Sequence, residues 1–126
     1  MNLSTFQALR EVSRGAAMPL RIRGGCMAPA FDDGATVTVR ARRFYFPGDV
    51  LVFRTNAGDL AAHRMLGWRR AALVTKGDGC EVHDAPVAPN TILGAVELPV
   101  RMRDRIRAVR HFARIAAQSL LREFVQ

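Results

Sequence analysis

Residues 47–66 read PGDVLVFRTNAGDLAAHRML and contain two strand signals joined by a hairpin signal. The opening Pro-Gly-Asp is a turn sequence. Val50–Phe53 has no polar residue, which is typical of a strand buried on both faces. Asn56–Asp59 has the composition of a hairpin turn, and Leu60–Leu66 continues as a second strand, which contains His63. This stretch predicts a β core.

Short strands bounded by turn residues are predicted on both sides of this hairpin. Apolar or alternating segments indicate strands at 20–23, 36–40, 71–75 and 91–96. Gly67–Arg70 is expected to form the turn before the strand at 71–75. Strands this short, with turns between them, favour a coiled all-β core over βαβ units.

A helix is predicted at each end of the chain. Near the N-terminus, apolar residues recur at helical spacing: Leu3, Phe6, Leu9 and Val12. Ser4 or Thr5 is expected to cap this short helix. From about Arg103 a longer stretch of roughly twenty residues carries an apolar stripe consisting of Ile106, Val109, Ala113, Ala116, Leu120 and Phe124.

The longer helix is strongly basic. Five arginines lie largely off its apolar stripe: Arg103, Arg107, Arg110, Arg114 and Arg122. A basic amphipathic helix of this kind can lie on an anionic membrane surface. It can equally cover the β core or bind a protein partner, and the sequence leaves these alternatives open.

The length of 126 residues indicates a single domain, in which residues 1–15 form the N-terminal helix, 20–98 the β region and 103–126 the C-terminal helix. Hydrophobic residues make up 49% of the chain, enough for one core. No apolar run approaches the roughly 18–20 residues of a membrane-spanning helix, and the N-terminus lacks a secretory signal pattern. We therefore expect a cytoplasmic protein, with or without peripheral contact to the inner membrane.

The formal net charge of +8 favours anionic partners without choosing among them. Nucleic acid is not expected, because one Trp and one Tyr cannot interleave a basic surface with stacking rings. No phosphate-binding or dinucleotide fingerprint is present. Cys80 and His83 have Cys-x-x-His spacing without a second pair, which is weak as a metal signal. We expect neither a metal nor another cofactor.

One set of residues offers nucleophile, base and acid. Cys26 follows Gly24-Gly25 on a predicted bend, where a thiol would be presented outward. His63 is the best available base, because its pKa is ordinarily near neutral. Asp78 or Asp84 could orient the imidazole, although aspartates in such loops more often shape turns.

The order of these motifs resembles the signal peptidase I-like (S24/S26) peptidases, in particular their serine-histidine branch. The matching blocks span about residues 20–98 and are Gly25-Cys26-Met27-Ala28-Pro29, Asp33-Gly34, Pro47 to Phe53, His63-Arg64, Thr75 to Asp78, Asp84 and Leu93 to Val96. The resemblance implies a coiled β fold of the signal peptidase/LexA-like type. It also implies that Cys26 stands where the family has its nucleophilic serine, with Gly25 and Met27 beside the substrate.

Within this resemblance, His63 would be the general base and Asp78 or Asp84 the orienting acid. A thiol in place of serine keeps a nucleophile, because an adjacent imidazole favours the thiolate. The family's membrane-spanning anchor is not found, so a peptide or protein substrate in the cytoplasm is expected. Two hypotheses follow: an endopeptidase that uses Cys26 and His63, or a non-catalytic module that keeps the fold and binds a peptide or partner.

Overall fold

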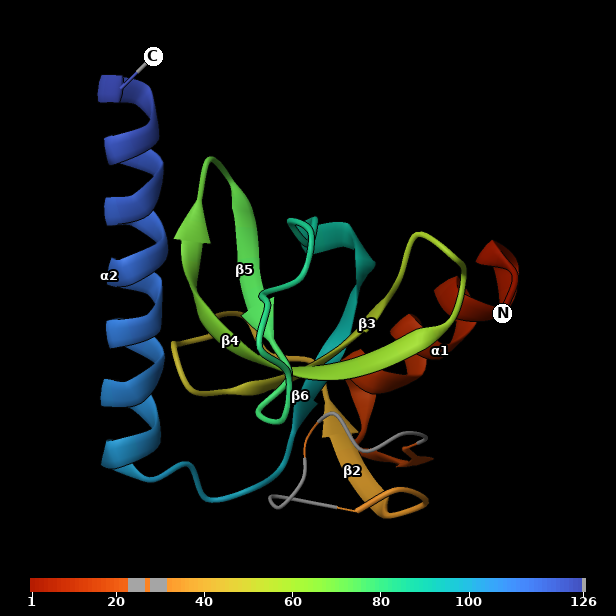
Figure 1. Cartoon of the computed structure of the whole chain (residues 1–126). Helices are drawn as coiled ribbons and strands as arrows, with labels where there is room; N and C mark the ends of the chain where they lie inside the picture. The colour runs from red at the N-terminus through yellow and green to blue at the C-terminus, as the bar shows by residue number, and fades with distance from the viewer. Residues whose placement is uncertain (23–26, 28–31, 126) are drawn as a thin grey trace.

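One antiparallel sheet of six strands, with an α-helix near each terminus, makes up most of the residues that the computed structural model describes, namely 1–22, 27 and 32–125 (Figure 1). The elements in chain order are α1 (Leu3–Gly15), β1 (Met18–Arg21), β2 (Thr36–Arg40), β3 (Val50–Arg54), β4 (Leu60–Arg69), β5 (Ala72–Lys76), the 3₁₀ turn η1 (Pro89–Thr91), β6 (Ile92–Val96) and α2 (Met102–Val125). The predicted mainly β fold with a helix at each end is confirmed.

The strand order in the sheet is β1-β2-β6-β3-β4-β5. β3, β4 and β5 are joined by successive hairpins. β6, which follows β5 in the sequence, lies between β2 and β3 and pairs with both. All neighbouring strands pair antiparallel. The short strands and tight turns predicted from the sequence therefore form a single sheet, with β1 and β5 at its edges.

The apolar run of β3 is buried on both faces, as predicted. Val50 and Val52 join a core cluster with Phe6 of α1, whereas Leu51 and Phe53 join a second cluster on the other face. Successive strand residues point to opposite faces. A run of four apolar residues is therefore needed where both faces are covered.

The start of α1 differs from the prediction. Asn2 caps the helix, and its side-chain oxygen accepts a hydrogen bond of 2.8 Å from the backbone N–H of Thr5. The expectation of Ser4 or Thr5 as the cap was wrong, because the helix begins at Leu3 and both residues already lie within its first turn.

The β4–β5 turn was also wrongly predicted. β4 continues through Gly67 to Arg69, and the turn consists of Arg70 and Ala71, whose φ angles are 52° and 62°. Gly67 belongs to the strand because α2 packs against it: an added Cβ would lie 2.7 Å from the Phe112 ring. The glycine therefore marks a close approach between helix and sheet rather than a turn.

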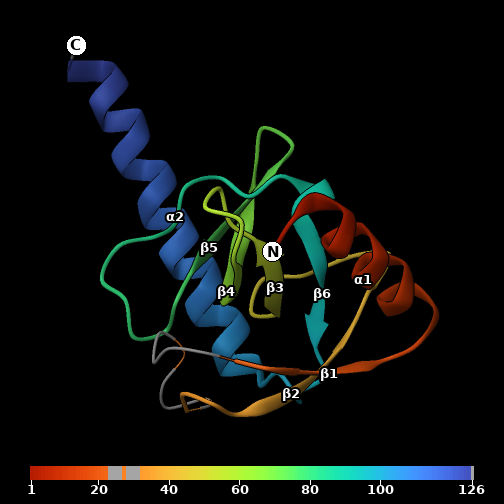
Figure 2. The same ribbon diagram turned by 90° about the vertical axis from the view of Figure 1, so that its right-hand side faces the viewer.

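α2 contacts the sheet through a face other than the predicted apolar stripe. Ala108, Phe112 and Ile115 pack with Leu66 and Val74 of β4 and β5. The predicted stripe is instead mostly exposed: Ile106, Val109, Ala113 and Leu120 are exposed and Ala116 is half-buried, while the side chain of Phe124 lies outside the described residues. The C-terminal part of α2 extends past the sheet (Figure 2). Neither described α-helix has an apolar segment that could cross a membrane.

Candidate functional site

His63 lies in the middle of β4, paired in register with Leu51 of β3. The edge of its ring packs against Phe53, with the ring centroids 5.9 Å apart and the planes at 74°. Its side chain is 14% exposed. A histidine with so little solvent around it has a fixed orientation, which a general base requires.

Asp84 is the aspartate that contacts His63. Its Oδ2 lies 2.5 Å from His63 Nδ1 and accepts a hydrogen bond of 2.7 Å from the hydroxyl of Thr75. The Asp84 backbone N–H also donates to the carbonyl of Thr75 at 2.9 Å. Thr75 lies on β5 and is fully buried. The loop carboxylate is thus attached to the sheet at two points beside the imidazole.

The surroundings of Asp84 favour its charged form. Burial raises the pKa of this carboxyl, but the hydrogen bonds from His63 and Thr75, with the charges of His63 and His83, outweigh burial and hold the pKa below its ordinary value. An ionised Asp84 has only acceptor oxygens, so when His63 is neutral this carboxylate favours the tautomer that carries the proton on Nδ1. In that tautomer the lone pair of the ring is on Nε2, the arrangement of a histidine base oriented by an acid.

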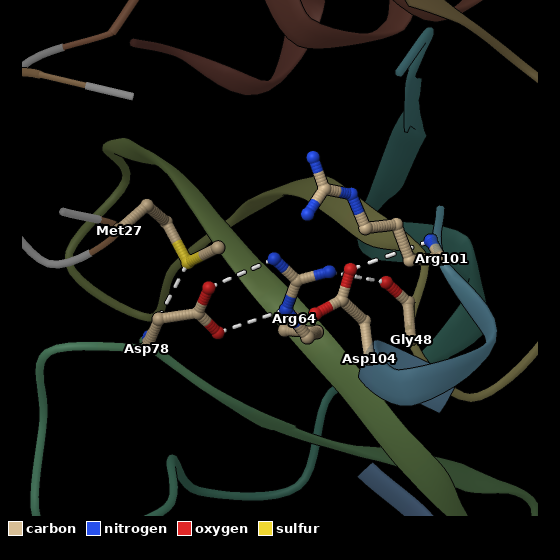
Figure 3. Close-up of polar contacts among 6 residues, drawn as sticks. All are labelled: Met27, Gly48, Arg64, Asp78, Arg101 and Asp104. Carbon is tan, nitrogen blue, oxygen red and sulfur yellow. Dashed lines mark hydrogen bonds and ion pairs between the residues drawn. The ribbon is translucent and has the colours of Figure 1, made fainter. Parts of the chain in front are cut away.

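Asp78 belongs to a second polar cluster. Its carboxylate accepts two hydrogen bonds of 2.8 Å from Nε and Nη2 of Arg64, and Arg64 Nη1 donates to the carbonyl of Gly48 at 2.7 Å (Figure 3). The bonds to Asp78 raise the pKa of the Arg64 guanidinium, whose side chain is 12% exposed. This arginine therefore carries a permanent, almost buried charge.

Met27 joins the same cluster. The Asp78 backbone N–H points at the Met27 sulfur at 3.4 Å, and Met27 is only 2% exposed within the core cluster that contains Val50 (Figure 3). Met27 follows Cys26 directly in the sequence. The Arg64–Asp78 pair therefore holds the residue next to the predicted nucleophile, while Cys26 and Gly25 themselves lie outside the described residues.

Strand geometry separates the two aspartates. His63 and Arg64 are consecutive in β4, so their side chains leave on opposite faces of the sheet. Asp78 and Asp84 come from the one loop that follows β5, and each reaches a different face. The sequence offered both as the orienting acid; in the structure only Asp84 has a hydrogen bond to His63 among the described contacts.

Two cavities adjoin the β4 segment that carries His63. One, of about 360 Å³, is lined by His63 and Asp84 together with Phe53, Ala61 and Val87. The other, of about 540 Å³, lies between β1 and the β3–β4 hairpin, and its apolar lining consists of Leu20, Ile22, Val52, Leu60 and Ala62. Ala61 lines both cavities. Space for a ligand is thus available on both sides of the strand, one residue from the imidazole.

Sequence reasoning missed three residues of this site: Thr75, Phe53 and Arg64. The sequence gives Thr75 and Phe53 a strand position and a place in a motif block but no role at the site, yet they fix Asp84 and His63. Arg64 had been noted only as part of a motif. The available signal was its place directly after His63 in an alternating strand, which predicts a separate partner on the other face.

Within residues 1–22, 27 and 32–125, no group of three or more His, Cys, Asp or Glu side chains is arranged to hold a metal ion. Comparison with known proteins finds no matching family model and no matching curated sequence.

Proposed function

We propose that this protein is a peptidase of the signal peptidase-like type, in which Cys26 is the nucleophile, His63 the general base and Asp84 the residue that orients the base. The observation that carries the proposal is the His63–Asp84–Thr75 arrangement. A buried hydroxyl and an imidazole share one carboxylate oxygen, which fixes both the tautomer and the direction of the ring.

The proposed reaction has two halves, formation of a thioester on Cys26 and its hydrolysis. His63 Nε2 takes the Cys26 thiol proton, and the thiolate attacks the scissile carbonyl carbon to form a tetrahedral intermediate. The C–N bond then breaks, His63 donates the proton to the leaving amine, and a thioester to Cys26 remains. Water, deprotonated by His63, hydrolyses the thioester and returns the thiol. Asp84 stays ionised and stabilises the imidazolium formed in each half.

The 540 Å³ cavity between β1 and the β3–β4 hairpin supports an extended peptide as the substrate. Its apolar lining suits small or medium side chains, and β1 is an edge strand of the sheet. An extended chain beside a strand edge gains main-chain hydrogen bonds and places alternate side chains in pockets. Because Ala62 and His63 alternate along β4, this cavity would hold side chains of the peptide on the face opposite the imidazole, and the 360 Å³ cavity would hold the part of the peptide beside His63.

Asp78 takes a positioning role in this proposal. Through its backbone N–H it contacts Met27, and through its carboxylate it neutralises Arg64. The first contact holds the residue that follows Cys26, and the second fixes Asp78 against β4. Catalytic chemistry is therefore assigned to Asp84 and support of the nucleophile segment to Asp78.

The first test measures the pH dependence of iodoacetamide labelling at Cys26 by mass spectrometry, with Cys80 as the internal reference. A thiolate supported by His63 should label fast even below about pH 7. His63→Ala and Asp84→Asn should each slow labelling about tenfold, and the exposed His83→Gln should leave it unchanged. A thiol pKa near 8.5 in all variants would instead support a non-catalytic peptide-binding module.

The second test incubates the full chain with a mixture of peptides and identifies new termini by mass spectrometry. We expect cleavage that is lost in both Cys26→Ala and His63→Ala, while circular dichroism shows that both variants remain folded. Cleavage that survives in either variant would contradict the proposed mechanism.

A further inference from the structure

The apolar side of α2 that faces away from the sheet forms a continuous stripe. Four of its large side chains have high exposed fractions: Met102 70%, Ile106 47%, Val109 51% and Leu120 58%. With 3.6 residues per turn, these residues and Ala113 fall within a sector of about 60° around the helix. We call them the α2 stripe. They lie side by side without a partner among the described residues, because α2 uses Ala108, Phe112 and Ile115 to contact the sheet.

An arginine ridge borders the α2 stripe. Arg103, Arg107, Arg110 and Arg114 are all exposed and lie about 100° around the helix from the stripe, on the side away from the sheet. The only acidic residues of α2 are Asp104 and Glu123, and neither lies in the stripe or in the ridge. The exposed side of α2 is therefore apolar along one line and, from Arg103 to Arg114, positive along the next.

The loop before β3, which contacts the same helix, carries exposed aromatic side chains. Phe44 and Phe46 of this loop are 65% and 57% exposed. Arg105 of α2 donates to the carbonyl of Pro47 at 3.0 Å, which joins this loop to the helix. Figure 1 shows this loop beside α2. Arg42 and Arg43 add further positive charge there.

We propose that the α2 stripe, the arginine ridge and these aromatic residues together bind the headgroup region of an anionic lipid bilayer. The apolar stripe would enter the boundary between headgroups and acyl chains, and the arginines would contact lipid phosphates while their stems cover apolar surface. Aromatic rings favour the same depth. This inference is independent of the proposed peptidase function.

Charge decides against a second copy of the chain as the occupant. A symmetric dimer through the α2 stripe would place two four-arginine ridges beside one another, with no acidic residue in either to compensate. The net charge of +8 adds to this repulsion. An anionic bilayer, in contrast, complements the ridge and the stripe at once.

The test is co-sedimentation of the full chain with vesicles of phosphatidylcholine alone and of phosphatidylcholine mixed equally with phosphatidylglycerol. We expect binding to the mixed vesicles at least about tenfold tighter than to phosphatidylcholine. The double variant Ile106→Asp/Leu120→Asp and the triple variant Arg107→Gln/Arg110→Gln/Arg114→Gln should each weaken binding about tenfold or more.

Matched controls alter equally exposed residues elsewhere. Val82→Asp changes an apolar side chain that is 73% exposed in the loop after β5, and Arg122→Gln removes an α2 arginine outside the ridge; both should bind like the unmodified chain. Equal binding to both vesicle types, or undiminished binding of the α2 variants, would overturn the proposal. So would a dimer in solution that Ile106→Asp/Leu120→Asp dissociates.

Discussion

His63–Asp84 and Arg64–Asp78 are neighbouring pairs that leave β4 on opposite faces, and they differ in almost every property. The first pair can exchange a proton, shares its carboxylate with Thr75 and adjoins a cavity of about 360 Å³, whereas the cavity beside the second pair is about 50 Å³. In the second pair, the Arg64 guanidinium is permanently charged. It donates two hydrogen bonds to the Asp78 carboxylate and one to the carbonyl of Gly48. A single loop after β5 supplies both aspartates, so strand alternation alone separates a pair suited to chemistry from a pair suited to support.

The largest effect on stability is expected at the supporting pair. Asp78→Ala would leave the Arg64 guanidinium, 12% exposed, without its two carboxylate hydrogen bonds. We expect the free energy of unfolding to fall by about 2–3 kcal/mol, measured by urea denaturation. Arg64→Met added to Asp78→Ala should restore part of the loss. A decrease below about 0.5 kcal/mol in Asp78→Ala would show that solvent replaces the carboxylate.

A smaller, pH-dependent effect is expected for Asp84→Asn. The folded-state pKa of Asp84 lies below its unfolded value, so its charge stabilises the fold fully above the unfolded pKa of about 3.9 and loses this effect as the pH falls through the folded pKa. At neutral pH the substitution should cost about 1.5 kcal/mol. The difference between the two proteins should shrink under acid. A difference that stays constant from neutral pH to pH values well below 3.9 would contradict this account.

Thr75→Val tests the donor behind Asp84. The substitution keeps the shape of a fully buried side chain but removes the hydroxyl that donates to Asp84 Oδ2. We expect a loss of about 1 kcal/mol and a rise in the pKa of Asp84 toward its ordinary value. NMR titration of the Asp84 carboxyl would measure that pKa. The control is Thr91→Val, which removes a hydroxyl whose hydrogen bond is exposed to solvent.

Met27→Leu should have the smallest effect. Leucine fills a similar volume in the core, and only the weak sulfur contact to the Asp78 N–H is lost. We expect a decrease of about 0.5 kcal/mol in the free energy of unfolding. Slower Cys26 labelling with unchanged stability would separate positioning of the nucleophile segment from packing.

Most strands were predictable because their burial follows local rules, although β1 begins at Met18, two residues before the predicted start at Leu20. β2 alternates between exposed and buried residues, and β3 is buried throughout, as the pattern of each indicates. The turn at Arg70 and Ala71 was not predictable, because neither residue favours positive φ. Gly67 was misleading as a turn residue, because it is needed for close contact with a helix about forty-five residues later in the sequence. Tertiary contacts, rather than local preference, decide such positions.

The same limit applies to α2 and to the candidate site. The strongest apolar periodicity of α2 marked the face that points away from the sheet, because Ala108 and the glycine opposite Phe112 permit close packing on a less apolar face. For the site, the sequence selected His63 and two aspartates, but the choice of Asp84 depends on where a loop crosses the sheet edge. The path of a loop depends on contacts such as the hydrogen bond from Thr75, and the spacing of residues in the sequence does not predict such contacts.

The place of β6 in the sheet has a consequence for how the chain folds. β3, β4 and β5 are neighbours in sequence and can pair as soon as residue 76 is available, whereas β1 and β2 join the rest of the sheet only through β6. Closing that long connection costs more chain entropy than closing the hairpins. During synthesis on the ribosome, the meander that carries His63 can therefore assemble first, and the N-terminal third joins it only after residues 92–96 have emerged.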